Sequence, residues 1–96
     1  MKRSHYKLLV PDDLAGLVRT MHPHLKKKIK ASLQIILSDP LAGKALKDEL
    51  AGLKSFRVRK FRIVYRVSSK KQIEIVALGP RERIYEETFR LLQKNK

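Results

Sequence analysis

Residues Phe56 to Val67 read Phe-Arg-Val-Arg-Lys-Phe-Arg-Ile-Val-Tyr-Arg-Val, two short runs in which apolar and basic side chains alternate. Alternation with a period of two is typical of a β-strand, whose successive side chains point to opposite faces. Arg59 and Lys60 lie between the runs at the spacing of a two-residue hairpin turn, although the Asn-Gly or Asp-Gly pair that favours such a turn is missing. The pattern therefore predicts a β-hairpin that carries guanidinium groups on one face, from Arg57, Arg62 and Arg66.

This row of arginines has two interpretations. Like charges side by side on a sheet repel one another, so an anionic ligand is one reason to keep them there. The other interpretation is the solvated outer face of an ordinary sheet, which the alternation alone slightly favours.

Composition limits the class of protein. The 96 residues suit one domain, residues 1–96, and an apolar fraction of 43% spread along the chain argues against disorder. A formal net charge of +14 predicts a polyanion or an acidic protein as partner. The absence of cysteine excludes disulfides, thiol catalysis and thiolate zinc sites. No apolar run approaches the roughly 20 residues of a membrane span, and no signal-peptide core follows the N-terminus, so a cytoplasmic protein is expected.

The first half of the chain predicts one strand and two helices. A short apolar run from His5 to Val10 predicts the strand, and Pro11-Asp12-Asp13 is typical of a helix start. Apolar residues then recur twice at helical spacing, interrupted by His22-Pro23-His24, so two amphipathic helices should pair antiparallel. The first helix uses Leu14, Leu17, Val18 and Met21, and the second uses Leu25, Ile29, Leu33, Ile36 and Leu37.

The second half predicts the rest of a small sheet and a last helix. Asp39-Pro40 ends the second helix, and a connector from Leu41 to Leu53 follows, with one helical turn around Ala45 to Glu49. After the hairpin, Gln72 to Leu78 is apolar enough to be a central strand covered on both faces.

Beyond Gly79-Pro80, the charge pattern predicts a C-terminal helix with Tyr85, Phe89 and Leu92 facing inward. The expected fold is α+β in the order βααβββα. It has a small, mainly antiparallel four-stranded sheet, with two N-terminal helices packed on it and a C-terminal helix, and the helices lie on one face.

Several kinds of chemistry do not fit the sequence. The four glycines are too scattered for a phosphate-binding loop, so no nucleotide cofactor is expected. His22 and His24 flank a helix break without a third nearby ligand, which favours a loop role over a metal site. The few carboxylates do not suit two-metal phosphodiester chemistry. The sequence favours chemistry that needs neither a metal nor a cofactor.

Basic residues and one tyrosine remain as candidates. Residues 54–71 hold eight basic side chains and no acidic one. If the second hairpin strand pairs antiparallel with the next strand, Arg62 lies near Gly79, and Arg81 and Tyr85 follow at the same sheet edge. Two guanidinium groups can clamp a phosphate and stabilise charge on a pentacovalent phosphorus, and the 2′-hydroxyl of RNA supplies a nucleophile. Tyr85 could position a nucleotide or stack on a base, and a core tyrosine is about equally expected.

At these residues the chain resembles the RelE/ParE superfamily of toxins from type II toxin-antitoxin pairs. The resemblance runs nearly the full length and is carried by three segments together: Ala45 to Val58 (ALKDELAGLKSFRV), Phe61 to Tyr65 (FRIVY) and Leu78 to Tyr85 (LGPRERIY). It implies a small sheet with two N-terminal helices and a C-terminal helix. It also implies an acidic antitoxin wrapped around the basic surface, in a heterodimer or heterotetramer.

The RelE branch cuts messenger RNA in the ribosomal A site by attack of the 2′-hydroxyl on the neighbouring phosphate, without a metal. The resemblance implies that Arg62 holds the phosphate, that Arg81 protonates or stabilises the leaving oxygen and that Tyr85 orients the nucleotide. Arg57 completes the predicted catalytic set. The predicted RNA-binding residues are Lys54, Arg59, Lys60, Arg66 and Arg83.

The chain departs from the family pattern in the hairpin. Arg57 and Arg59 stand where some members carry lysines, one of which is proposed as a general base, and a guanidinium barely deprotonates. The ParE branch, which poisons DNA gyrase, keeps the fold but generally lacks the arginine and tyrosine set. A gyrase-directed toxin and a plain RNA-binding module are therefore the alternatives to a ribosome-dependent mRNA endonuclease.

Overall fold

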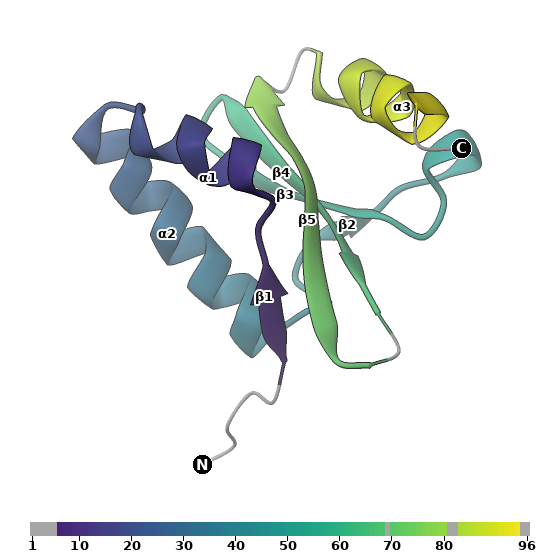
Figure 1. The fold of residues 1–96 in the computed structure, drawn as a ribbon. Coiled ribbons are helices and arrows are strands. Elements are labelled where there is room, and N and C mark those ends of the chain that lie inside the picture. Colours follow the sequence, from purple (N-terminus) through teal and green to yellow (C-terminus); the bar gives the residue numbers. More distant parts are fainter. Residues whose placement is uncertain (1–5, 69, 81–82, 95–96) are drawn as a thin grey trace.

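The computed structural model describes residues 6–68, 70–80 and 83–94. Three α-helices, one 3₁₀ helix and five strands follow one another through these residues (Figure 1). In chain order they are β1 (Lys7–Leu9), α1 (Asp12–Arg19), α2 (Pro23–Ser38), β2 (Lys44–Ala45), η1 (Asp48–Leu50), β3 (Lys54–Val58), β4 (Phe61–Val67), β5 (Gln72–Pro80) and α3 (Ile84–Lys94).

The sheet has five strands in the order β1-β5-β4-β3-β2. All neighbours pair antiparallel except β1, which runs parallel to β5. The α+β class is confirmed, but the prediction of four strands in the order βααβββα is wrong in detail. The connector contains the additional strand β2, whose two residues are too few to show an alternating pattern, and its helical turn is η1.

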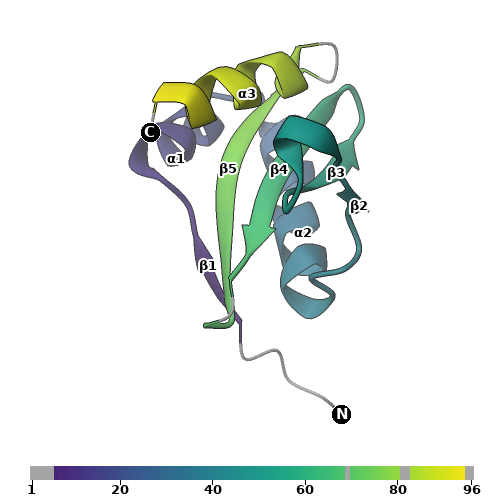
Figure 2. The same ribbon diagram turned by 90° about the vertical axis from the view of Figure 1, so that its right-hand side faces the viewer.

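The helices cover both faces of the sheet, which corrects the expectation that they lie on one face (Figures 1 and 2). Ile29 and Ile36 of α2 pack on one face with a cluster that includes Ile63. Ile84 of α3 packs on the other face with a cluster that includes Val64. Because Ile63 and Val64 are consecutive strand residues, they point to opposite faces, and both are almost fully buried. The sheet is therefore the middle layer of the fold.

The boundaries of the N-terminal helices agree with the sequence signals. Pro11 caps the start of α1, with Asp12 and Asp13 in its first turn, and α2 ends at Ser38, before Asp39-Pro40. His22 caps the start of α2, where its Nδ1 accepts a hydrogen bond from the His24 N–H at 3.2 Å. The predicted loop role therefore holds for His22, which caps α2, whereas His24 lies in the first turn of that helix.

Tyr85 and Leu92 of α3 pack against the cluster that includes Val64, as predicted, whereas Phe89 does not take its predicted inward position. Ile84 and Thr88 are buried, Tyr85 is half-buried and Phe89 is 38% exposed. The Thr88 hydroxyl donates to the Ile84 carbonyl at 2.7 Å, so this polar residue satisfies its hydrogen bond within the helix. Within residues 6–68, 70–80 and 83–94, no helix is long and apolar enough to cross a membrane.

Candidate functional site

The β3–β4 hairpin places its arginines where the alternation predicts. Arg57 pairs with Arg62 and Val58 pairs with Phe61, which leaves Arg59 and Lys60 as the two turn residues. Arg59 has a φ of 56°, in the left-handed region that glycine or asparagine usually fills in such turns. The two-residue hairpin is therefore confirmed, although its turn lacks the usual residues.

Arg62 and Tyr85 meet at a single acceptor, the hydroxyl of Ser55. The Arg62 Nη1 donates to the Ser55 Oγ at 3.2 Å, and the Tyr85 hydroxyl donates to the same oxygen at 3.3 Å. A hydroxyl oxygen has two acceptor lone pairs, so both bonds can form together. The Arg62 Cζ lies 6.0 Å from the centre of the Tyr85 ring, at the outer limit of a cation–π contact. Side chains from β3, β4 and α3 thus form one cluster, which we call the Ser55 cluster: Ser55, Arg62 and Tyr85.

The Ser55 cluster has a buried acceptor and two donors that reach the surface. Ser55 is only 2% exposed, whereas Arg62 and Tyr85 are half-buried. The buried Ser55 hydroxyl fixes the orientation of both side chains. The remaining N–H groups of Arg62 and the ring face of Tyr85 stay within reach of a ligand. Tyr85 packs against the core cluster that includes Val64 while its hydroxyl reaches Ser55, so this tyrosine combines the two expected positions.

The β4–β5 register places Arg62 directly opposite Gly79, as the sequence predicts. Two residues further along the chain, Arg81 lies outside the described residues, so its predicted position beside Arg62 stays a prediction. Arg83 is exposed immediately before α3, and its backbone carbonyl accepts a hydrogen bond from Glu87.

The other predicted basic residues divide between three places. Arg57, Arg59 and Lys60 are exposed at the tip of the hairpin, and the Arg57 Nε donates to the Arg59 carbonyl at 3.3 Å. Lys54 follows the alternation of β3 onto the face opposite Ser55. Arg66 is about 13 Å from Arg62 along the strand, at roughly 3.3 Å per residue.

Arg66 also forms an ion pair with Glu74 at 2.9 Å. In residues 6–68, 70–80 and 83–94, no carboxylate lies within ion-pair distance of Arg57, Arg59, Lys60 or Arg62. These four side chains therefore present uncompensated positive charge, which fits a phosphate ligand. No three histidine, aspartate or glutamate side chains gather as a metal site in the part of the chain that the structure describes.

The sequence analysis missed two contacts, one within the candidate site and one that supports the fold. Ser55 lies two residues before Arg57, so the alternation of the strand predicts that both lie on the same face. The alternation does not reveal that the Ser55 hydroxyl accepts hydrogen bonds from Arg62 and Tyr85. Tyr65 is fully buried on the other face, where its hydroxyl donates to the Pro40 carbonyl at 2.8 Å and accepts from the Gly43 N–H at 2.9 Å. Tyr65 thereby attaches the connector to the sheet.

Burial raises the pKa of Tyr65, and the carboxylate of Asp39 raises it further, while the hydrogen bond from Gly43 acts in the opposite direction. The phenol of Tyr65 is thus kept neutral. Tyr65 therefore has a structural role, and the tyrosine that contacts the Ser55 hydroxyl of the candidate site is Tyr85.

Comparison with known proteins places this sequence in a family. The sequence matches the family model for the ParE toxin of the type II toxin-antitoxin system parDE over residues 6–85. No curated protein matches the chain.

Solved structures of RelE toxins share the fold. The free E. coli RelE toxin, in a mutant form, is similar with a TM-score of 0.73 and 19% identity, over 94% of this chain and 96% of that chain. The RelBE2 toxin-antitoxin complex of Mycobacterium tuberculosis gives 0.68 and 23%, over 79% and 98%. The archaeal RelE–RelB complex from Pyrococcus horikoshii gives 0.68 and 22%, over 81% and 97%.

Proposed function

The chain belongs to the ParE toxin family of type II toxin-antitoxin systems, within the RelE/ParE superfamily, and we propose that it acts as a ribosome-dependent endoribonuclease that cleaves mRNA. The observation that carries the proposal is the Ser55 cluster, in which Arg62 and Tyr85 converge on one buried hydroxyl. This arrangement presents a guanidinium and a phenol at one point of the surface. A binding function that used charge alone would not need a tyrosine fixed beside the arginine.

The chemistry uses the substrate's own nucleophile. The 2′-hydroxyl of one nucleotide gives its proton to solvent and attacks the adjacent phosphorus, where a new O–P bond forms. The bond to the 5′-oxygen of the next nucleotide breaks, and that oxygen takes up a proton. The products are a 2′,3′-cyclic phosphate and a 5′-hydroxyl. Arg62 binds the phosphate oxygens, whose negative charge grows in the transition state, and this electrostatic stabilisation lowers the barrier.

Two further residues complete the proposed mechanism. Tyr85 orients the nucleotide by its hydroxyl or by stacking on a base. Arg81 neutralises the leaving 5′-oxygen, a role that rests on the resemblance in sequence. Because a guanidinium is a poor general base, Arg57 contributes charge and not proton abstraction. Arg59, Lys60 and Arg83 extend the cationic surface along which the RNA backbone lies, and Lys54 and Arg66 contribute only to the general field.

We also propose an acidic antitoxin as the partner that holds the toxin inactive. The net charge of +14 favours a partner of opposite charge, and two of the structural neighbours are complexes of a RelE toxin with its antitoxin. The proposed target is the ribosome with its mRNA, which places the activity in the cytoplasm.

A gyrase-directed toxin is the second candidate, because the matching family model is that of ParE. Under this alternative the chain would poison DNA gyrase without cleaving RNA. A gyrase supercoiling assay with the purified toxin separates the two: inhibition of supercoiling together with intact mRNA on ribosomes would favour the gyrase target.

The test of the proposal is primer extension on programmed ribosomes with purified wild-type protein. We expect discrete A-site cuts, which Arg62→Ala and Tyr85→Phe greatly reduce. Arg90→Ala is the matched control, because Arg90 is an exposed arginine of α3 that pairs with Glu86 at 2.7 Å, and it should cut like the wild type. Intact mRNA with folded wild-type protein would contradict an endoribonuclease. RNA binding without cutting would instead indicate a binding module.

A further inference from the structure

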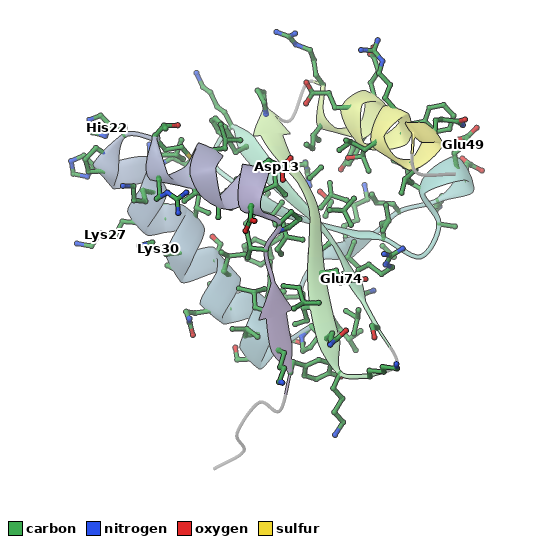
Figure 3. All side chains as sticks on the ribbon, in the orientation of Figure 1. Asp13, His22, Lys27, Lys30, Glu49 and Glu74 are labelled. Atoms are coloured by element: carbon green, nitrogen blue, oxygen red, sulfur yellow. The ribbon has the colours of Figure 1, made fainter. Side chains whose placement is uncertain are left out.

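A second cationic site lies across the sheet from the Ser55 cluster, where the α1–α2 turn meets the tip of the hairpin. A cavity of about 740 Å³ opens there between the start of α2 and the turn of β3–β4. Figure 3 shows His22 at this end of the molecule, with Lys27 and Lys30 further along α2. The cavity, which we call the histidine pocket, is lined by His22, His24, Leu25, Lys28, Arg57, Arg59, Lys60 and Phe61.

The histidine pocket has the composition of an anion site. Lys28 from α2 and Arg57, Arg59 and Lys60 from the hairpin all line it, and no carboxylate is among the lining residues that the structure describes. All four cations are exposed, and the two segments that supply them lie far apart in the sequence. Four uncompensated cations around one cavity repel one another, so a bound phosphate group would relieve a repulsion that already exists.

The two histidines add a proton-dependent charge to the histidine pocket. Their rings stack with centroids 5.2 Å apart and planes 15° apart. Imidazole is the side chain whose charge ordinarily changes between pH 5 and 8. The His22 Nδ1 accepts the capping bond from the His24 N–H, so a proton on that nitrogen would remove the cap of α2. The His24 ring has no such constraint in the part of the chain that the structure describes, which makes it the ring that can take up a proton without loss of a bond.

We propose that the histidine pocket binds a second phosphate group of the RNA and that His24 takes up a proton when it does. This inference rests on the proposed action on RNA. Arg57 connects the two places, because it lines the histidine pocket and pairs across the hairpin with Arg62 of the Ser55 cluster. One RNA strand that passes around the tip of the hairpin would therefore contact the Ser55 cluster with one phosphate and the histidine pocket with another.

The proposal predicts the direction of a pH effect. A phosphate bound in the histidine pocket places negative charge beside the His24 ring, which favours a proton on that ring. The bound state then holds more protons than the free state, so affinity rises as the pH falls. For one proton, the dissociation constant changes by up to about tenfold per pH unit within the range in which histidine titrates.

The experiment measures binding of a short single-stranded RNA by fluorescence anisotropy from pH 5.5 to 8.5 at constant ionic strength. We expect the wild type to weaken as the pH rises, and His24→Gln to bind with little dependence on pH. His5→Gln removes the third histidine of the chain and should keep the dependence. Lys28→Gln should reduce the number of counterions released on RNA binding by about one, read from the slope of log affinity against log salt. Lys27 does not line the histidine pocket, so Lys27→Gln should leave that slope unchanged.

A second measurement follows the imidazole resonances by NMR during a pH titration, with and without the RNA. We expect the midpoint of His24 to move to higher pH when RNA is bound, and an unchanged midpoint would contradict the inference. If binding does not depend on pH but A-site cutting persists, the histidine-pocket proposal fails and the nuclease stands. If proton-linked binding occurs without cutting, the nuclease proposal fails and the histidine-pocket proposal stands as a feature of RNA binding. No RNA binding at any pH would overturn the histidine-pocket proposal, whereas the nuclease is decided by A-site cutting on ribosomes.

Discussion

Replacement of Tyr65 by phenylalanine should lower the free energy of unfolding, because it removes the two hydrogen bonds of the Tyr65 hydroxyl. The Tyr65 hydroxyl donates to the Pro40 carbonyl at 2.8 Å and accepts from the Gly43 N–H at 2.9 Å. A typical intramolecular hydrogen bond contributes about 1 kcal/mol net, so the loss of both should lower the free energy of unfolding by about 2 kcal/mol. Pro40 and Gly43 are half-buried, so water can hydrogen-bond to their freed backbone groups. The free energy of unfolding should therefore not fall by more than this amount.

The assay is urea denaturation followed by circular dichroism at pH 7, with Tyr85→Phe as the matched control. Tyr85 loses a single half-buried bond of 3.3 Å, so its variant should lose less than about 1 kcal/mol of the free energy of unfolding. In thermal unfolding, a loss of 2 kcal/mol corresponds to a decrease in Tm of roughly 10 °C for a chain of this size. A Tyr65→Phe variant as stable as the wild type would refute the assignment of Tyr65 as the residue that attaches the connector.

The same substitution should change the response to alkaline pH. Burial, reinforced by Asp39, raises the pKa of Tyr65 in the folded state despite the opposing bond from Gly43. The folded state therefore holds a proton that the unfolded state releases near pH 10, the ordinary value for tyrosine. The stabilisation is fully present below about pH 10 and is lost as the pH rises above it. Tyr65→Phe should thus lose stability less steeply above pH 10 than the wild type, and parallel curves would contradict this reasoning.

Three more predictions concern single contacts. A Cβ on Gly43 would lie 2.6 Å from the Tyr65 hydroxyl, so Gly43→Ala should destabilise the fold by about 1–3 kcal/mol through overpacking, measured by urea denaturation. Ser55→Ala should lower the rate of cleavage on ribosomes by releasing Arg62, while stability falls by only about 1 kcal/mol because water can reach the freed donors; full activity would contradict the role of Ser55 as a positioning residue. Glu74→Gln breaks an exposed ion pair on the same sheet and should alter the free energy of unfolding by less than about 1 kcal/mol in salt-matched buffers.

The sequence was most informative where one physical rule acted alone. Alternation predicted the hairpin, and its two-residue turn then fixed the pairing of Arg57 with Arg62. The pairing of Arg62 with Gly79 followed from antiparallel geometry alone. Proline and acidic residues similarly placed the start of α1 and the end of α2, because they act on the local backbone.

Prediction failed where tertiary packing set the outcome. The two-residue strand β2 exists because β3 offers an edge, and no pattern in two residues could reveal it. The expected inward position of Phe89 assumed a helix orientation that packing against β5 and η1 decides, and Ile84 and Thr88 take the buried positions instead. The contact between Tyr65 and Gly43 joins residues 22 positions apart, a separation that local patterns do not reach.

The most direct test of the proposed chemistry removes the nucleophile from the substrate. An mRNA with a single 2′-deoxynucleotide at the mapped A-site cut is placed on programmed ribosomes with the wild-type toxin, beside the all-ribose message. The mechanism predicts that cutting disappears at the substituted position and that the all-ribose message yields a 2′,3′-cyclic phosphate and a 5′-hydroxyl. Cutting of the deoxy-substituted bond at an undiminished rate would contradict attack by the 2′-hydroxyl and, with it, the role proposed for Arg62 and Tyr85.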